Sequence, residues 1–120
     1  MKEPRDLSDH LPLTDPVFHI MLALADRQRH GYAVMLEVER RTRGAVKLRP
    51  GTLYRAIGRM SESGLLEEVD TRPAPELDDE RRRYYRLTDL GRGVAAAEAR
   101  RRAAEIEWAR DVKLLHPKEA

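Results

Sequence analysis

Seven basic side chains lie between residues 40 and 60 with no carboxylate among them. They are Arg40, Arg41, Arg43, Lys47, Arg49, Arg55 and Arg59. Cationic groups clustered on one face attract phosphates, so this run favours binding of a polyanion such as nucleic acid. The next twenty residues carry eight acids against one arginine, an asymmetry that the net charge of +2 conceals. Charge alone also suits an ordinary solvated surface.

The residue types that catalysis or metal binding requires form no recognisable pattern. The chain has no cysteine and four histidines, and the histidines lack the spacing of metal ligands. No serine lies in a nucleophile turn, and Gly91 with Gly93 are too few for a nucleotide-binding loop. We therefore expect no enzyme activity, no cofactor and no metal site.

Length and composition indicate one domain with one modest core. The chain has 120 residues, of which 41% are hydrophobic and 37% are charged. No apolar run approaches the roughly 20 residues of a membrane span, and the first ten residues lack the apolar core of a signal peptide. These features predict a cytoplasmic protein that does not enter a membrane.

Two helices are expected in the first half of the chain. After an arm at residues 1–13, Thr14, Asp15 and Pro16 form a helix start, and apolar residues then recur at helical spacing to about residue 26. A second helix begins at Gly31 and ends near residues 43–44. Its apolar side is expected to consist of Tyr32, Met35, Leu36 and Val38.

A third helix begins at Pro50 and ends at Gly64. Leu53, Ile57 and Met60 share the face that turns toward the core, whereas Thr52, Arg55 and Arg59 share another face that points outward. Residues 65–71 and 81–88 then predict two short strands joined by a polar loop, that is, a hairpin or wing. Thr88 caps a last helix that runs to about residue 115.

This order of elements is that of a winged helix-turn-helix. The major groove of DNA is about 12 Å wide and admits one helix, whose N-terminal half meets the base edges. Thr52 and Arg55 lie in that half of the third helix, so they are the candidate base-reading residues. The other six basic residues of the run are better placed to hold phosphates. They are Arg40, Arg41, Arg43, Lys47, Arg49 and Arg59.

Three ordered segments carry a resemblance to a known family. GYAVMLEV, PGTLYRAIGRMSESGLL and RRRYYRLTDLG together resemble the PadR family of bacterial transcriptional regulators, over roughly residues 13–91. The resemblance implies a winged-helix homodimer that binds operator DNA, usually as a repressor released by a small aromatic effector. It also favours a contact between Tyr54 and the DNA backbone; the alternative is that Tyr54 flanks the core.

The chain departs from the family pattern in two places. Family members often have proline where this chain has Arg55, so no operator sequence can be carried over. The loop of the hairpin carries four acids in residues 76–80, and phosphates would repel them. We therefore expect the base of the wing to contact DNA, through Arg81, Arg82 and Arg83.

The last helix is expected to form a dimer. A stripe of mostly small residues runs along it with one large aromatic anchor, Trp108. The stripe consists of Val94, Ala97, Ala104, Trp108, Val112 and Leu115. Alternatively, Trp108 covers the core of its own chain. Trp108 is also the candidate contact for an aromatic effector.

The sequence thus predicts a mainly α fold with a small β-hairpin. Residues 1–13 form a flexible arm, residues 14–88 the DNA-binding domain, and residues 89–120 the dimerisation helix and tail. The predicted function is sequence-specific binding of double-stranded DNA at an inverted-repeat operator by a homodimer. The alternative is a winged-helix module that binds a protein and not DNA.

Overall fold

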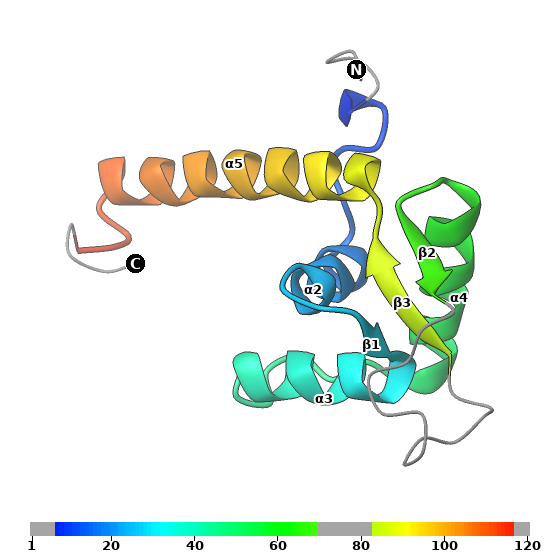
Figure 1. The fold of residues 1–120 in the computed structure, drawn as a ribbon. Helices are drawn as coiled ribbons and strands as arrows, with labels where there is room; N and C mark the ends of the chain where they lie inside the picture. Colours follow the sequence, from blue (N-terminus) through cyan, green and yellow to red (C-terminus); the bar gives the residue numbers. More distant parts are fainter. Residues whose placement is uncertain (1–6, 70–82, 117–120) are drawn as a thin grey trace.

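Four helices and a small sheet make up the part of the chain that the structure describes, residues 7–69 and 83–116 of a computed structural model (Figure 1). In chain order they are α2 (Asp15–Leu24), β1 (Arg29–His30), α3 (Gly31–Arg41), α4 (Pro50–Glu62), β2 (Leu66–Val69), β3 (Tyr84–Leu87) and α5 (Asp89–Asp111). The predicted fold class, a winged helix-turn-helix followed by a long helix, is confirmed.

Three helices, α2, α3 and α5, begin after a residue whose side chain satisfies a free backbone N–H group, whereas α4 begins at Pro50 without a side-chain cap. The Thr14 hydroxyl accepts from the Val17 N–H at 3.5 Å, and the Thr88 hydroxyl accepts from the Gly91 N–H at 3.0 Å. His30 caps α3 in the same way through Nδ1, a role that the sequence analysis did not assign. Gly64 follows α4 with a φ of 79°, as predicted.

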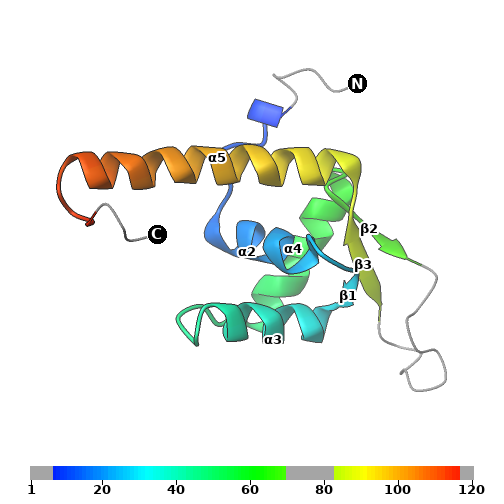
Figure 2. The ribbon, with the colours of Figure 1, turned by 60° about the vertical axis from the view of Figure 1, so that its left-hand side comes forward.

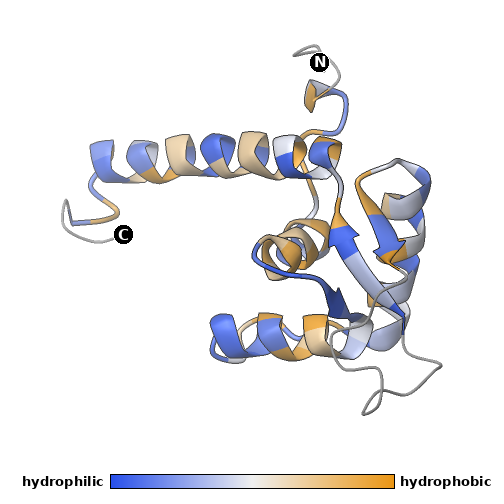
Figure 3. Cartoon of the chain, viewed as in Figure 1, coloured by the Kyte–Doolittle hydropathy of each residue, from blue (hydrophilic) through white to orange (hydrophobic). Residues whose placement is uncertain are grey.

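The core forms around α2, whose mostly apolar ribbon lies between the other helices (Figure 3). Ile20, Met21 and Leu24 of α2 are fully buried or nearly so. Leu53, Ile57 and Met60 of α4 also face the core, as their spacing predicts. Leu7, Leu11 and Leu13, which belong to the predicted arm, pack against the edge of this core.

The predicted apolar side of α3 is right for Val38 and Met35, which face the core, and wrong for Tyr32 and Leu36. Val34 and Val38, one turn apart, are buried against the core, whereas Tyr32 and Leu36 remain about half exposed. The buried stripe continues to Gly31, so the helix is rotated relative to the expected face. The valines are short enough to let α3 approach α2 and α4 closely, which the larger Tyr32 and Leu36 would prevent.

The sheet has three strands and not two. Its order is β1-β3-β2 with both pairs antiparallel, and β1 adds Arg29 and His30 opposite Tyr85 and Tyr84. A strand of two residues has no periodicity to detect, so the sequence could not reveal it. In β3, Tyr85 and Leu87 are buried and Arg86 is exposed, the alternation of a strand with one face on the core.

The long helix α5 packs on α2 and β3 at its start and then extends past both (Figures 1 and 2). It ends at Asp111, four residues before the predicted end. Val94 is fully buried in the core of the chain, so its assignment to a dimer interface is wrong. Among the described residues, neither α5 nor any other helix is long and apolar enough to cross a membrane.

Alanine substitutions at two glycines are expected to change the stability in opposite directions. A Cβ at Gly91 would lie 1.9 Å from the carbonyl oxygen of Leu65, whereas a Cβ at Gly58 would meet nothing within 4 Å. We expect Gly91→Ala to lower the free energy of unfolding by about 2 kcal/mol or more, because the backbone must shift. Gly58→Ala should raise it by about 0.5–1 kcal/mol, because a mid-helix glycine is entropically costly. Urea denaturation of both variants measures the difference.

Candidate nucleic-acid interface

The connection between α3 and α4 is a tight turn held by one hydroxyl. Arg43 and Gly44 both have positive φ values, 53° and 81°, which reverse the chain after α3. The Thr42 hydroxyl donates to the Val38 carbonyl at 2.8 Å and accepts from the Val46 N–H at 3.0 Å. The turn therefore holds the start of α4 at a defined position relative to α3.

Helix α4 presents its polar face to solvent. Arg55 and Arg59 are exposed, in agreement with the spacing, whereas Thr52 is half-buried. The Arg55 side chain passes over Gly51, where an added Cβ would lie 3.4 Å from Nη1. The absence of a side chain at residue 51 thus leaves room for the Arg55 guanidinium beside the first turn of the helix.

Five basic side chains around this turn and α4 have no ion-pair partner among the residues that the structure describes. They are Arg43, Lys47, Arg49, Arg55 and Arg59, and all five are exposed. Unpaired cations keep their full charge for an external anion, and a phosphate can replace their counterions without breaking an internal bond. We call these five residues the open basic surface.

Arg40 and Arg41, predicted to contact phosphates, are instead ion-paired with Glu37. Each places a guanidinium nitrogen 2.9 Å from Glu37 Oε2, and Arg29 approaches the same oxygen at 3.8 Å. Hydrogen bonds from Arg41 and Arg40 lower the pKa of Glu37 from 4.5 to about 2. A charge count that starts at residue 40 misses Glu37, although its spacing to both arginines is that of a helical ion pair.

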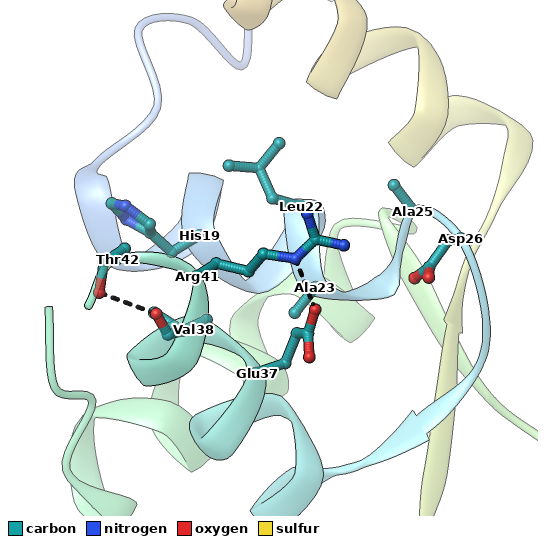
Figure 4. A pocket seen from close by; sticks show the side chains of 9 residues that line it. All are labelled: His19, Leu22, Ala23, Ala25, Asp26, Glu37, Val38, Arg41 and Thr42. Carbon is teal, nitrogen blue, oxygen red and sulfur yellow. Dashed lines mark hydrogen bonds and ion pairs between the residues drawn. The ribbon is translucent and has the colours of Figure 1, made fainter. Parts of the chain in front are cut away.

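Arg41 also lies at a groove between α2 and α3, of about 400 Å³ (Figure 4). Leu22, Ala23 and Val38 give the groove an apolar floor, and Glu37 with Arg41 forms a charged edge. Arg41 therefore faces α2 and is less suited to an external anion than the open basic surface.

Tyr54, half exposed on α4, lies against the first residue of α3. A Cβ at Gly31 would come within 2.5 Å of the Tyr54 hydroxyl oxygen, so this packing requires glycine at residue 31. The phenol therefore lies beside the N-terminus of α3. Arg59 lies at the opposite end of α4, where it borders a hollow of about 210 Å³ with His10 and Pro12.

The wing residues are only partly described. Arg83 pairs with Glu68 at 3.7 Å, and Arg86 pairs with Glu67 at 2.8 Å. Arg81, Arg82 and the acidic residues 76–80 lie outside the described residues. The charge of Arg83 is thus partly offset by a neighbouring strand.

Several large apolar side chains at the free end of α5 and just after it are exposed. Trp108 is 68% exposed and Val112 53%, while Ala104 is exposed and Ala97 and Leu115 are half-buried. Ile106 and Leu114 are exposed as well, although the predicted stripe omitted both. Trp108 does not belong to the residues that line either of the two hollows described above. Because Trp108 is largely exposed and is absent from the residues that pack on the core, it does not cover the core of its own chain.

No group of three or more histidine, aspartate or glutamate side chains within residues 7–69 and 83–116 is arranged to hold a metal ion.

A family model described as transcriptional regulator PadR-like matches residues 20–97. Transcriptional regulator Rv3488 of Mycobacterium tuberculosis is 37% identical over 94 residues, 78% of each chain. An uncharacterized protein of Lysinibacillus sphaericus is 27% identical over 73 residues, which span 61% of this chain and 64% of that protein.

Solved structures share the fold. A PadR family regulator from Clostridium difficile matches with a TM-score of 0.66 at 22% identity, over 82% of this chain and 98% of that one. Bacillus subtilis PadR, solved in complex with operator DNA, matches with a TM-score of 0.59 at 15% identity, over 72% of this chain and 47% of that one.

The ion pairs of Glu37 predict a pH dependence of stability. Because the pKa of Glu37 is lowered in the folded chain, its contribution is complete above pH 4.5 and is lost as the pH falls toward about 2. We expect Glu37→Gln to be less stable than the parent at pH 7 and to lose less stability between pH 5 and pH 2.5. The denaturant midpoint of each protein, measured across this pH range, tests the prediction. An equal fall of the midpoint with pH in the two proteins would contradict it.

Proposed function

Because the chain belongs to the PadR-like family of transcriptional regulators, which are not enzymes, we propose that it is a repressor that binds operator DNA as a homodimer. The observation that carries the proposal is the open basic surface. Its five cations lie around the turn and on α4, the helix that a winged helix-turn-helix inserts into the major groove. Bacillus subtilis PadR, which shares the fold, was solved in complex with operator DNA, and this supports DNA as the ligand.

Different residues of this surface contact different parts of the DNA in this proposal. Arg55 lies in the N-terminal half of α4, and its guanidinium can donate to both O6 and N7 of a guanine. Half-buried Thr52 offers less contact area and serves as a secondary reader. Arg43, Lys47 and Arg49 lie in the segment before α4. They hold phosphates, together with the Tyr54 hydroxyl.

Dimerisation is proposed through the free end of α5. Exposed Trp108 and Val112, which lie one helical turn apart, provide an apolar surface that a second copy can cover. A two-fold dimer through this helix presents two copies of α4, so the operator is expected to be an inverted repeat. The indole of Trp108 at such an interface also offers an aromatic effector a surface on which to stack.

Substitutions in the open basic surface should separate base reading from phosphate contact. The DNA would be selected by the parent protein from random duplexes. We expect Arg55→Ala to weaken binding of the selected sequence by about 5- to 150-fold, and binding of random duplex much less. Arg49→Ala should weaken both alike and lower the slope of log affinity against log salt by about one.

Arg100→Ala is the matched control, because Arg100 is exposed on α5 and outside the open basic surface. Equal losses for Arg55→Ala and Arg100→Ala would contradict the proposed reading face. A parent chain that binds no duplex even at low salt would instead favour a protein-binding module.

The dimer proposal predicts a change of mass. Trp108→Glu places a charge in the proposed interface, and we expect it to shift the protein from dimer to monomer in sedimentation at micromolar concentrations. Leu36→Glu is the control, since Leu36 is about as exposed as Val112 but lies on α3. A parent chain that sediments as a monomer would refute the proposed interface.

A further inference from the structure

Glu98 of α5 is a fully buried carboxylate whose two oxygens receive four hydrogen bonds. The Leu13 N–H and Arg101 Nε each donate to Oε1 at 3.1 Å. Arg101 Nη2 donates to Oε2 at 2.7 Å, and Arg102 Nε donates to the same oxygen at 2.6 Å. Glu98 therefore bonds α5 to the backbone of the segment that leads into α2.

Arg102 makes the second connection between the same elements. Its Nη2 lies 2.9 Å from Asp15 Oδ1 and 3.5 Å from the Leu13 carbonyl oxygen. Its guanidinium carbon also lies 4.4 Å from the centre of the Phe18 ring of α2. One arginine thus bridges the buried Glu98 of α5 to the first turn of α2. We name Glu98, Arg102 and Asp15 the α5 latch.

The latch lies where α5 leaves the rest of the domain. Residues 103–108 are all exposed, and the second half of the helix projects beyond α2 and α3 (Figure 2). From Glu98 to Trp108 the helix rises about 15 Å, so a tilt of about 10° at the latch would move Trp108 by about 2.6 Å. In a dimer through α5, such a tilt changes the distance between the two copies of α4.

The latch opposes such a tilt. Moving α5 away from α2 would separate Arg102 from Asp15. It would also take the Leu13 N–H, the one donor to Glu98 that lies outside α5, away from a fully buried carboxylate. The fold therefore holds α5 at one angle to α2, and α2 in turn packs on α4.

We propose that Glu98, Arg102 and Asp15 are positioning residues that set the distance between the two reading helices of the dimer and so select one spacing between operator half-sites. This inference rests on the proposed function. One added base pair moves a half-site by about 3.4 Å along the DNA axis and turns it by about 34°. A dimer of fixed geometry therefore binds an operator with one added base pair weakly, whereas a dimer whose α5 can tilt binds it nearly as well as the original spacing.

The experiment selects bound sequences from a pool of random duplexes and compares the half-site spacings. Asp15→Asn and Arg102→Met are the test variants, because Asp15 is exposed and Arg102→Met keeps an apolar stem against Phe18. Glu105→Gln is the control, since Glu105 pairs with Arg101 on the same helix and is absent from the contacts of the latch. Sedimentation of each variant verifies that it remains a dimer.

For the parent and Glu105→Gln we expect one spacing, with an affinity at least 10-fold higher than for duplexes one base pair longer or shorter. For the two latch variants we expect the same half-site sequence at several spacings. Their affinity for the parent's spacing should exceed that for duplexes one base pair longer or shorter by less than about threefold. A single unchanged spacing in both latch variants would overturn the inference. A parent that selects no inverted repeat would instead overturn the proposed function.

Discussion

The buried face of α2 is the surface on which most of the fold packs. The other three helices and β3 all pack against this helix of ten residues. Full burial of a side chain such as Ile20, Met21 or Leu24 contributes about 1.5–3 kcal/mol. Because α4 and α5 both take their positions from α2, the helix proposed to read DNA and the helix proposed to join two copies are coupled through one small core. A change in the packing of α2 would alter both.

Carboxylates on the helices divide the basic residues into two groups. Glu37 binds Arg40 and Arg41 from within α3, and Glu98 binds Arg101 and Arg102 from within α5. Neither the turn after α3 nor α4, up to Met60, contains a carboxylate, so the cations there keep their charge. The net charge of +2 therefore describes this protein poorly, because internal pairing removes basic residues from one surface and leaves them on another.

Local chemistry made much of the fold predictable. Thr14, Gly64 and Thr88 mark helix ends through bonds to their own neighbours, and the alternation of β3 follows from its burial on one side. The rest depends on contacts between distant residues. Leu13 and Glu98 are separated by 85 positions, so no periodicity in α5 reveals that its glutamate is buried. The rotation of α3 likewise follows from the space left by α2 and α4.

The two edge strands of the described sheet, β1 and β2, are poor sites for the addition of a further strand. β1 has only two residues, and β2 has four, of which Glu67 and Glu68 are exposed and charged. Short edges and carboxylates discourage the addition of a strand from another molecule. Intermolecular β-sheet, a usual route to insoluble aggregates, is therefore disfavoured even where many copies of this protein are close together.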